Sequence, residues 1–444
     1  MPIDLLIRGG QLVTPTGVRE ADLAIDGGRI VGFDSADARD EIDATGLHVF
    51  PGLIDPHVHF NEPGRTEWEG FATGSAALTA GGGTVFFDMP LNSTPVLDVD
   101  AFDAKAALAA EKSVADFGLW GGLTPNNLDN MPALIERGVV GFKAFMCDTG
   151  IDDFAYADLD TLRKGMEIAA EHDALVAVHA ERQETAVALR ERADAAPQRD
   201  WETYLKSRPP LLEVVAVQEA LALAKDTGCR LHIVHVSVPY AIELVQQARA
   251  DGVDVTCETC PHYLAFTEDD LVERGASLKC APPLRNADAA AQLWEDLGGD
   301  RFAFVASDHS PCPPAMKDAD DPFKVWGGIA GVQSTRSVLL SGEPALKLDA
   351  IANLTAANVA DRFRIENKGQ IADGFDADLA LVDLSEPYEL TAGMLLDRHR
   401  ANPYVDRTFA GLTRRTILRG VTMYLDGNII ADPCGKLLTP WRLS

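Results

Sequence analysis

The chain has few basic side chains for its 444 residues. Lys and Arg number 39 against 68 Asp and Glu, which gives a formal net charge of −29. A protein that neutralises phosphate groups needs a basic surface, so this balance argues against nucleic-acid binding and against docking on a membrane of anionic lipid. Lysine is the scarcest charged residue, with 12 Lys and 27 Arg against 24 Glu and 44 Asp. Such an excess of Asp with little Lys is expected of a protein that stays soluble in concentrated salt, so we predict a halophilic protein.

Long apolar runs, a targeting signal and a cysteine framework are also missing. No run of 18 apolar residues is present, so no transmembrane helix is expected. The first ten residues, MPIDLLIRGG, lack the basic and apolar regions of a signal peptide. Seven cysteines without regular spacing fit a reducing compartment, and we predict a cytoplasmic protein. Cys257 and Cys260 form a CxxC pair, which we interpret as buried structural cysteines, with redox or zinc-ribbon use as the less favoured alternative.

The two ends of the chain share one pattern. Alternating apolar residues flank Asp26-Gly27 near the start and Asp426-Gly427 near the end. An Asp-Gly pair between such segments is a strong hairpin signal. We therefore expect strands from both termini to form one small β-sandwich domain, made of residues 1–50 plus 372–444.

The middle of the chain repeats a different pattern, in which a short apolar run precedes a helical stretch. Eight such repeats predict a (β/α)₈ TIM barrel over residues 51–371. An open doubly wound sheet is the alternative, but no GxGxxG motif opens a helix after the first run. The eight runs are residues 48–60, 82–89, 116–123, 139–146, 174–181, 230–237, 254–260 and 301–309.

Polar residues in these runs fall toward their carboxyl ends, which in a barrel form the face that carries active sites. A lone histidine in a strand is more often a core residue, and we interpret His172 and His232 in that way. A buried lysine is costly unless it is paired, neutralised or modified, although Lys143 could also be an edge residue that reaches solvent. Together, four histidines, a lysine and an aspartate suit a metal site of a hydrolase. These six residues are His57, His59, Lys143, His179, His235 and Asp308.

The segments around these residues resemble the metal-binding segments of the amidohydrolase superfamily. They are PGLIDPHVHF, GFKAFM, VAVHAE, HIVHVS and ASDHSP. The resemblance covers nearly the whole chain and is to the cyclic-amidase branch, which contains dihydroorotases, dihydropyrimidinases (hydantoinases) and allantoinases. It implies two divalent metal ions, usually zinc, with manganese, cobalt or iron also accepted by such ligands.

The resemblance also implies a role for each residue. His57, His59 and Asp308 would hold one metal, and His179 and His235 the other. Lys143, as a carbamate formed with CO₂, would bridge the two ions together with a hydroxide. Asp308 would be the catalytic residue, taking a proton from that hydroxide and delivering it to the leaving nitrogen of a ring amide.

The ring itself is less directly indicated. Dihydroorotases carry an arginine and a histidine for the substrate carboxylate, where this chain has Asn61 and Cys312. A neutral cyclic amide or ureide is therefore the expected substrate. Dihydropyrimidinases place a tyrosine shortly after the bridging lysine, and the first tyrosine here is Tyr156. The segments FNEPGRTEWEGF, DMPLNSTP, CETCPHYL and WGGIAGVQ resemble those of the allantoinases.

The favoured activity is thus the opening of the hydantoin ring of allantoin to give allantoate. A hydantoinase or dihydropyrimidinase is the nearest rival, a dihydroorotase is less favoured, and an inactive scaffold is least favoured because all six ligand positions are filled. Asn92, Ser310 and the backbone of Ala281 are expected to contact the substrate, although Asn92 would also suit a turn and Ser310 a loop cap. The resemblance further suggests a homo-oligomer, a tetramer or dimer.

Overall fold

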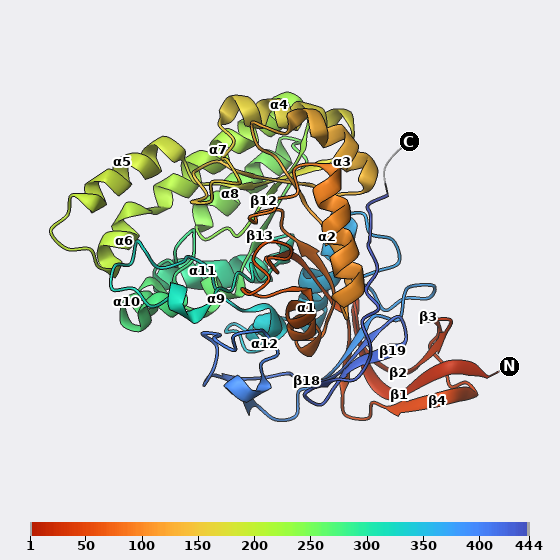
Figure 1. The fold of residues 1–444 in the computed structure, drawn as a ribbon. Helices are drawn as coiled ribbons and strands as arrows, with labels where there is room; N and C mark the ends of the chain where they lie inside the picture. Colours follow the sequence, from red (N-terminus) through yellow and green to blue (C-terminus); the bar gives the residue numbers. More distant parts are fainter. Residues whose placement is uncertain (1, 442–444) are drawn as a thin grey trace.

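The computed structural model describes residues 2–441 (Figure 1). Met1 and residues 442–444, at the outer ends of the predicted terminal domain, lie outside the described residues. Strands from both ends of the chain lie together on one side of the molecule, and helices surround the central strands (Figure 1). Within residues 2–441, no helix combines the length and the apolar composition that crossing a membrane requires.

Strands from the two termini pair in one nine-stranded sheet. Residues His48–Pro51 and Leu379–Asp383 run antiparallel and join the two ends of the chain. Asp26-Gly27 and Asp426-Gly427 each connect two antiparallel strands, which confirms both hairpin predictions. The strands are β1 (Ile3–Thr14), β2 (Gly17–Asp26), β3 (Arg29–Gly32), β4 (Ala38–Asp43), β5 (His48–Pro51), β15 (Leu379–Asp383), β18 (Leu412–Leu418), β19 (Val421–Leu425) and β20 (Asn428–Ile429).

The long strand β1 joins the N-terminal strands to one another in this sheet. Strand β1 is long enough to pair with β2 on one edge and with both β4 and β5 on the other. All of these strands therefore belong to a single hydrogen-bonded sheet, and its apolar side chains from both ends share one core, including Leu12, Val49 and Leu379. The sandwich and the division at residues 50/51 and 371/372 stay predictions.

Each of the eight predicted apolar runs contains a strand. The strands pair in parallel and in chain order, with Trp120 standing between β8 and β9. A parallel bridge between Val58 and His309 links the segment after the last strand to the first. The fold is thus mixed α/β. The strands are β6 (Leu53–Val58), β7 (Gly83–Asp88), β8 (Asp116–Leu119), β9 (Gly121–Gly122), β10 (Phe142–Phe145), β11 (Leu175–His179), β12 (Arg230–Ile233), β13 (Val255–Thr259) and β14 (Phe304–Val305).

Helices connect these strands, and local sequence explains where several of them begin. The side chains of Asp98, Asp158 and Asn286 each accept a hydrogen bond from a backbone N–H in the first turn of the helix that follows. These and the neighbouring helices are α1 (Phe71–Ala80), α2 (Val99–Lys112), α3 (Met131–Arg137), α4 (Leu159–Glu171), α5 (Gln183–Asp194), α6 (Trp201–Ser207), α7 (Pro210–Thr227), α8 (Pro239–Ala250) and α11 (Ala287–Gly298).

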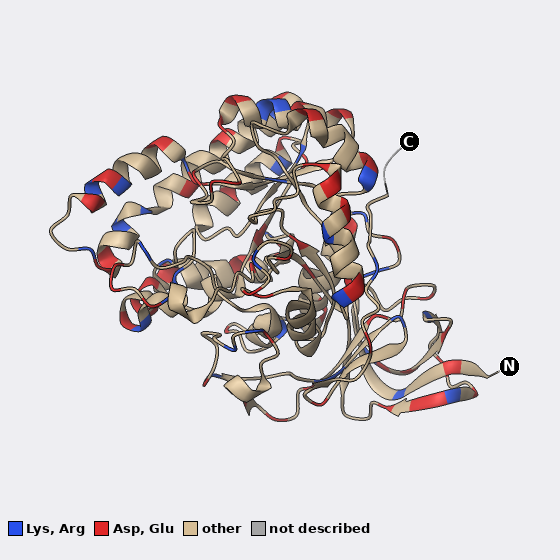
Figure 2. Ribbon diagram, in the orientation of Figure 1, with Lys and Arg blue, Asp and Glu red and all other residues tan. Residues whose placement is uncertain are grey.

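Charged residues follow two patterns. Asp and Glu lie along the helices that surround the strands, including α2, α4 and α5 (Figure 2). A smaller set is buried where the central strands meet the C-terminal segment. There the Lys368 ammonium lies 2.8 Å from Asp116 of β8 and 2.7 Å from Asp378. This buried ion pair joins the two parts of the chain.

Candidate metal centre

The six predicted ligands come together in one cavity of about 120 Å³. His57, Lys143 and His179 lie on β6, β10 and β11, and the other three lie in loops that follow β6, β12 and β14. Carboxyl ends of parallel strands meet at one edge, which explains how residues from 57 to 308 share a cavity. His235 and Asp308 have positive φ angles of 39° and 45°, a rare backbone conformation for residues other than glycine that is often found at functional sites.

The first group of ligands is His57, His59 and Asp308. Oδ1 of Asp308 lies 3.2 Å from Nε2 of His57 and 3.3 Å from Nε2 of His59. Ligands about 2.0 Å from a tetrahedral zinc ion are separated by about 3.3 Å, so these spacings fit a metal ion at their centre. The three ligand atoms also lie within 4.8 Å of one another. The donor set therefore fits a divalent metal.

The second group contains His179, His235 and Lys143. Nδ1 of His179 lies 2.9 Å from Nε2 of His235. Nδ1 of His235 and Nζ of Lys143 are buried and have no hydrogen-bond partner among the described residues. Burial lowers the pKa of Lys143 to about 8, which favours the neutral amine that CO₂ must meet to form a carbamate. The position of Lys143 therefore fits a carbamate that supplies oxygen ligands.

Two histidines of the centre, His57 and His235, are held neutral. Burial, followed by the charge of Lys143, lowers the pKa of His57 well below its usual value. Burial, followed by the neighbouring His179, has the same effect on the pKa of His235. Neutral imidazole is the form that binds a metal ion, so the electrostatics of the cavity agree with its geometry.

Glu258 is a buried acidic residue of the candidate centre that the sequence reasoning missed. Its Oε1 lies 2.6 Å from Nδ1 of His57, and its Oε2 lies 3.0 Å from Nε2 of His232. His232 is thus buried and satisfied, as expected, but its partner is the carboxylate that orients a metal ligand. A carboxylate behind a ligating histidine fixes the tautomer and the ring orientation. The available signal was a glutamate inside the apolar strand VTCET.

Glu181 is a second buried carboxylate that was missed. Its Oε2 lies 2.9 Å from Nε2 of His179 and also pairs with the Arg208 guanidinium. Burial by itself would raise the pKa of Glu181, but Arg208 and His179 lower it to about 2. Glu181 therefore stays ionised, and its position two residues after His179 was the signal that could have found it.

Two of the three predicted substrate contacts line the cavity, and the third does not. Ser310 and Ala281 line the cavity, together with Leu91, Phe145 and Trp326. Asn92 is not among the lining residues: its Nδ2 donates to the carbonyl oxygen of Pro63, and its Oδ1 accepts from the N–H of Ser93 at 2.8 Å. The geometry of Asn92 thus favours the turn interpretation.

Other interpretations can also be compared with the structure. Asn61 and Cys312 are buried outside the cavity lining, so neither supplies the cation that an anionic ring would need. Cys257 and Cys260 are buried, and all seven cysteines are free.

His172 is not a core histidine, which corrects that interpretation. It is exposed, because it follows the last residue of α4, where the apolar face of the helix has ended.

Comparisons with known proteins identify the family of this chain. Residues 48–429 match the amidohydrolase family. The chain is 51% identical over 443 residues to an allantoinase of Solibacter usitatus, covering 98% of this chain and 97% of the relative. It is 50% identical over 450 residues to an allantoinase of Deinococcus radiodurans, covering 100% of each.

Solved structures of hydantoinases share the fold of this chain. An L-hydantoinase (dihydropyrimidinase) from Arthrobacter aurescens superposes with a TM-score of 0.96 at 30% identity, covering 98% of this chain and 100% of that one. A D-hydantoinase superposes with a TM-score of 0.92 at 29% identity, covering 99% of each chain. The chain therefore belongs to the amidohydrolase family and is a hydrolase.

Proposed function

We propose that this protein hydrolyses the hydantoin ring of allantoin to give allantoate. The observation that carries the chemistry is the convergence of His57, His59, Lys143, His179, His235 and Asp308 in one buried cavity. The choice of ring is supported by identities of 50–51% to two allantoinases over nearly the full chain. Neutral residues at Asn61 and Cys312 agree with a neutral substrate.

The metal-binding roles follow from the two groups of ligands. We propose that His57, His59 and Asp308 hold one divalent ion, that His179 and His235 hold a second, and that carbamylated Lys143 gives oxygen ligands to both. Imidazole and carboxylate ligands suit zinc and also accept manganese, cobalt or iron. Such ions polarise the amide carbonyl and make water a better nucleophile.

The protein's own side chains then move the proton and hold the ring. Asp308 is partly accessible, with 13% of its side chain exposed, and faces the cavity. Its carboxylate accepts the proton of the attacking water as the new C–O bond forms. The same carboxyl then donates this proton to the ring nitrogen as the C–N bond breaks. Ser310 and the backbone of Ala281 lie in the cavity wall, where they can hydrogen-bond a neutral ring.

Hydantoinase activity is the second candidate. Two solved hydantoinases share this fold at 29–30% identity, which is well below the identity to the allantoinases. Purified protein expressed with zinc and bicarbonate should be assayed with allantoin, hydantoin, dihydrouracil and dihydroorotate. We expect the highest kcat/KM with allantoin. Turnover of another ring with allantoin inert would overturn the assignment, and a D308N variant serves as the inactive control.

Three further proposals concern architecture and setting. We propose that the eight parallel strands close as a (β/α)₈ barrel, which the bridge between Val58 and His309 supports. We also propose a halophilic cytoplasmic enzyme and a homo-oligomer, either a dimer or a tetramer. Sedimentation velocity in low and high salt would distinguish these assemblies from a monomer.

A further inference from the structure

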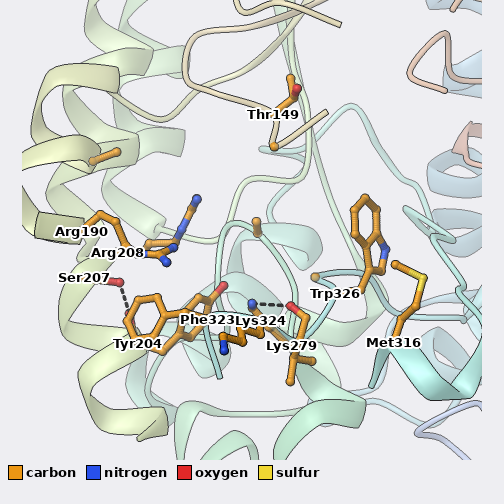
Figure 3. Close-up of a pocket in the computed structure, with 15 residues that line it drawn as sticks. Thr149, Arg190, Tyr204, Ser207, Arg208, Lys279, Met316, Phe323, Lys324 and Trp326 are labelled. Atoms are coloured by element: carbon orange, nitrogen blue, oxygen red, sulfur yellow. Dashed lines mark hydrogen bonds between the residues drawn. The ribbon is translucent and has the colours of Figure 1, made fainter. Parts of the chain in front are cut away.

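The cavity of about 120 Å³ that contains the six candidate ligands is called the metal-site cavity below. A second cavity, of about 340 Å³, adjoins it. The two share Thr149, Arg208, Ala281, Trp326 and Gly327 in their walls. Figure 3 shows this second cavity and its cationic side chains. We call it the basic annex and define it by its four cations, Arg190, Arg208, Lys279 and Lys324.

The charge of the basic annex is opposite to that of the chain. No Asp or Glu is among its lining residues, although the protein has 68 of them. The metal-site cavity, by contrast, has two carboxylates in its wall, Asp148 and Asp308, beside Lys143 and Arg208. A small anion that leaves the metal-site cavity through the shared wall would therefore enter a region with cations and no carboxylate.

Two cations of the basic annex form no ion pair with a carboxylate among residues 2–441. Lys279 is buried, and its Nζ donates to the carbonyl oxygens of Pro322 at 2.7 Å and Val325 at 2.6 Å. Its ammonium also lies 4.8 Å from the centre of the Tyr204 ring. Lys324 is exposed and makes no ion pair within residues 2–441. Both can still donate hydrogen bonds to an anion in the cavity.

The other two cations have carboxylate partners. Arg208 pairs with the buried Glu181, and Arg190 shares Asp194 with Arg199, so there one carboxylate serves two cations. Arg190 pairs with Asp194 at 3.0 Å on the exposed side of α5 and lies 4.6 Å from the Phe323 ring. Aromatic faces attract cations but do not cancel their charge. The basic annex thus keeps a positive field.

The crowding of these cations is visible in Lys279. Burial, followed by the charges of Arg208, Lys317 and Arg190, lowers its pKa to about 7. A bound anion would relieve that repulsion, since a carboxylate forms strong hydrogen bonds with Arg and Lys donors. Asp321 attracts both Lys279 and Lys324, but it is paired with Arg199 at 3.0 Å and does not line the annex.

We propose that the basic annex binds the carboxylate anion that ring opening produces, as that product leaves the metal-site cavity. This inference rests on the proposed function only in that a cyclic amide is opened. Addition of water forms a C–O bond, breaks the C–N bond and leaves a carboxylic acid, which ionises at neutral pH. A neutral ring would bind the annex weakly, whereas its anionic product would form charge-assisted hydrogen bonds there. The annex would therefore bind the product in preference to the substrate.

The test compares two double variants with the same change in net charge. R190E/K324E reverses two cations of the annex that do not line the metal-site cavity. K225E/K347E reverses two exposed lysines that line neither cavity and serves as the control. Isothermal titration with the purified ring-opened product in 0.05 M salt gives Kd directly and needs no turnover, and inorganic phosphate is a second probe.

We expect R190E/K324E to raise Kd for the product at least tenfold and K225E/K347E to leave it unchanged. Equal Kd values in the two double variants would overturn the proposal. A loss of phosphate binding with unchanged product binding would also overturn it, because the annex would then be a site for inorganic oxyanions. If allantoin is not turned over, the proposed function fails, but titration with the product of whichever ring is opened still tests the annex. Near-ultraviolet circular dichroism verifies that each variant is folded.

Discussion

The metal-site cavity and the basic annex share a wall, but their buried nitrogen-bearing side chains have different partners. In the metal-site cavity His57 and His179 each contact a carboxylate, Glu258 or Glu181. In the annex Lys279 contacts backbone carbonyls and an aromatic ring instead. The comparison teaches that a net charge of −29 does not describe the field inside a cavity. Local partners decide that field, because Coulomb interactions are strongest at short range and low dielectric.

The largest expected effect is the loss of metal and activity when Lys143 is replaced, compared with replacement of Lys279, the buried lysine of the annex. K143A should remove the carbamate, lose the metal pair and lower kcat/KM by about a thousandfold or more, since residues that act as a unit fail together. K279A changes the buried lysine of the annex and should keep its metal. Elemental analysis of both variants after expression with zinc and bicarbonate measures this difference. Full activity of K143A would contradict the bridging role, whereas partial rescue by short carboxylic acids would support it.

A second prediction compares a buried carboxylate that contacts a candidate metal ligand with one that does not. E258Q keeps the shape of the side chain but weakens the hydrogen bond to His57, so metal affinity should fall about 10- to 100-fold. E213Q is the matched control, because Glu213 is equally buried but bonds to Ser237 and Arg285 rather than to a metal ligand. Competition with a chromogenic chelator measures the affinity. Equal metal affinities in E258Q and E213Q would show that Glu258 does not position His57.

The third prediction uses the pKa of Lys279. Its folded-state pKa of about 7 is below the value of about 10.4 in an unfolded chain. Between these values the unfolded state binds more protons, so this group makes stability rise with pH, by about 1.4 kcal/mol per unit at most. Urea unfolding at pH 7, 8 and 9 should show this contribution in the wild type and its loss in K279M. Burial is the main cause of this low pKa, followed by the charges of Arg208, Lys317 and Arg190, while Asp321 acts in the opposite direction.

The same titration should also alter the annex. Above pH 7 Lys279 loses its charge, so product affinity should fall between pH 6 and pH 8 in the wild type. K279M should show a flatter profile over this range. An identical pH dependence in both proteins, for stability and for product binding, would remove Lys279 from the account of the annex.

The smallest expected effect is that of salt, which should act in opposite directions on the surface and on the annex. The Debye length falls from about 10 Å at 0.1 M to about 3 Å at 1 M salt. Repulsion among the surface carboxylates is then screened, so Tm should rise by several degrees between 0.05 M and 1 M salt. Product affinity should fall over the same range, because screening weakens its attraction to the annex. An unchanged Tm after dialysis to 0.05 M salt would remove the halophilic prediction and leave the chemistry untouched.

Several parts of the molecule were predictable because their signals are local. Apolar runs marked the central strands, and Asp-Gly pairs marked two hairpins. The candidate ligands were predictable because polar residues stand out in such runs, at or near the carboxyl end in every case except Lys143, which lies within β10. Glu258 and Glu181 could have been found by the same reasoning, since each is a carboxylate in or next to an apolar strand. Asn92 shows the limit, because a polar residue in a loop motif does not reveal which way its side chain turns.

The sequence by itself determined the strand-helix repeat, the family and the six residues of the centre, because periodicity and short motifs are properties of neighbouring residues. Only the tertiary structure decided that terminal strands join one sheet, that Glu258 links His57 to His232, and that a positive cavity adjoins the metal site. The four cations of the annex come from α5, the end of α6 and two later loops. Their common field exists only after these segments pack together, since charge interactions depend on distance in space and not on separation along the chain.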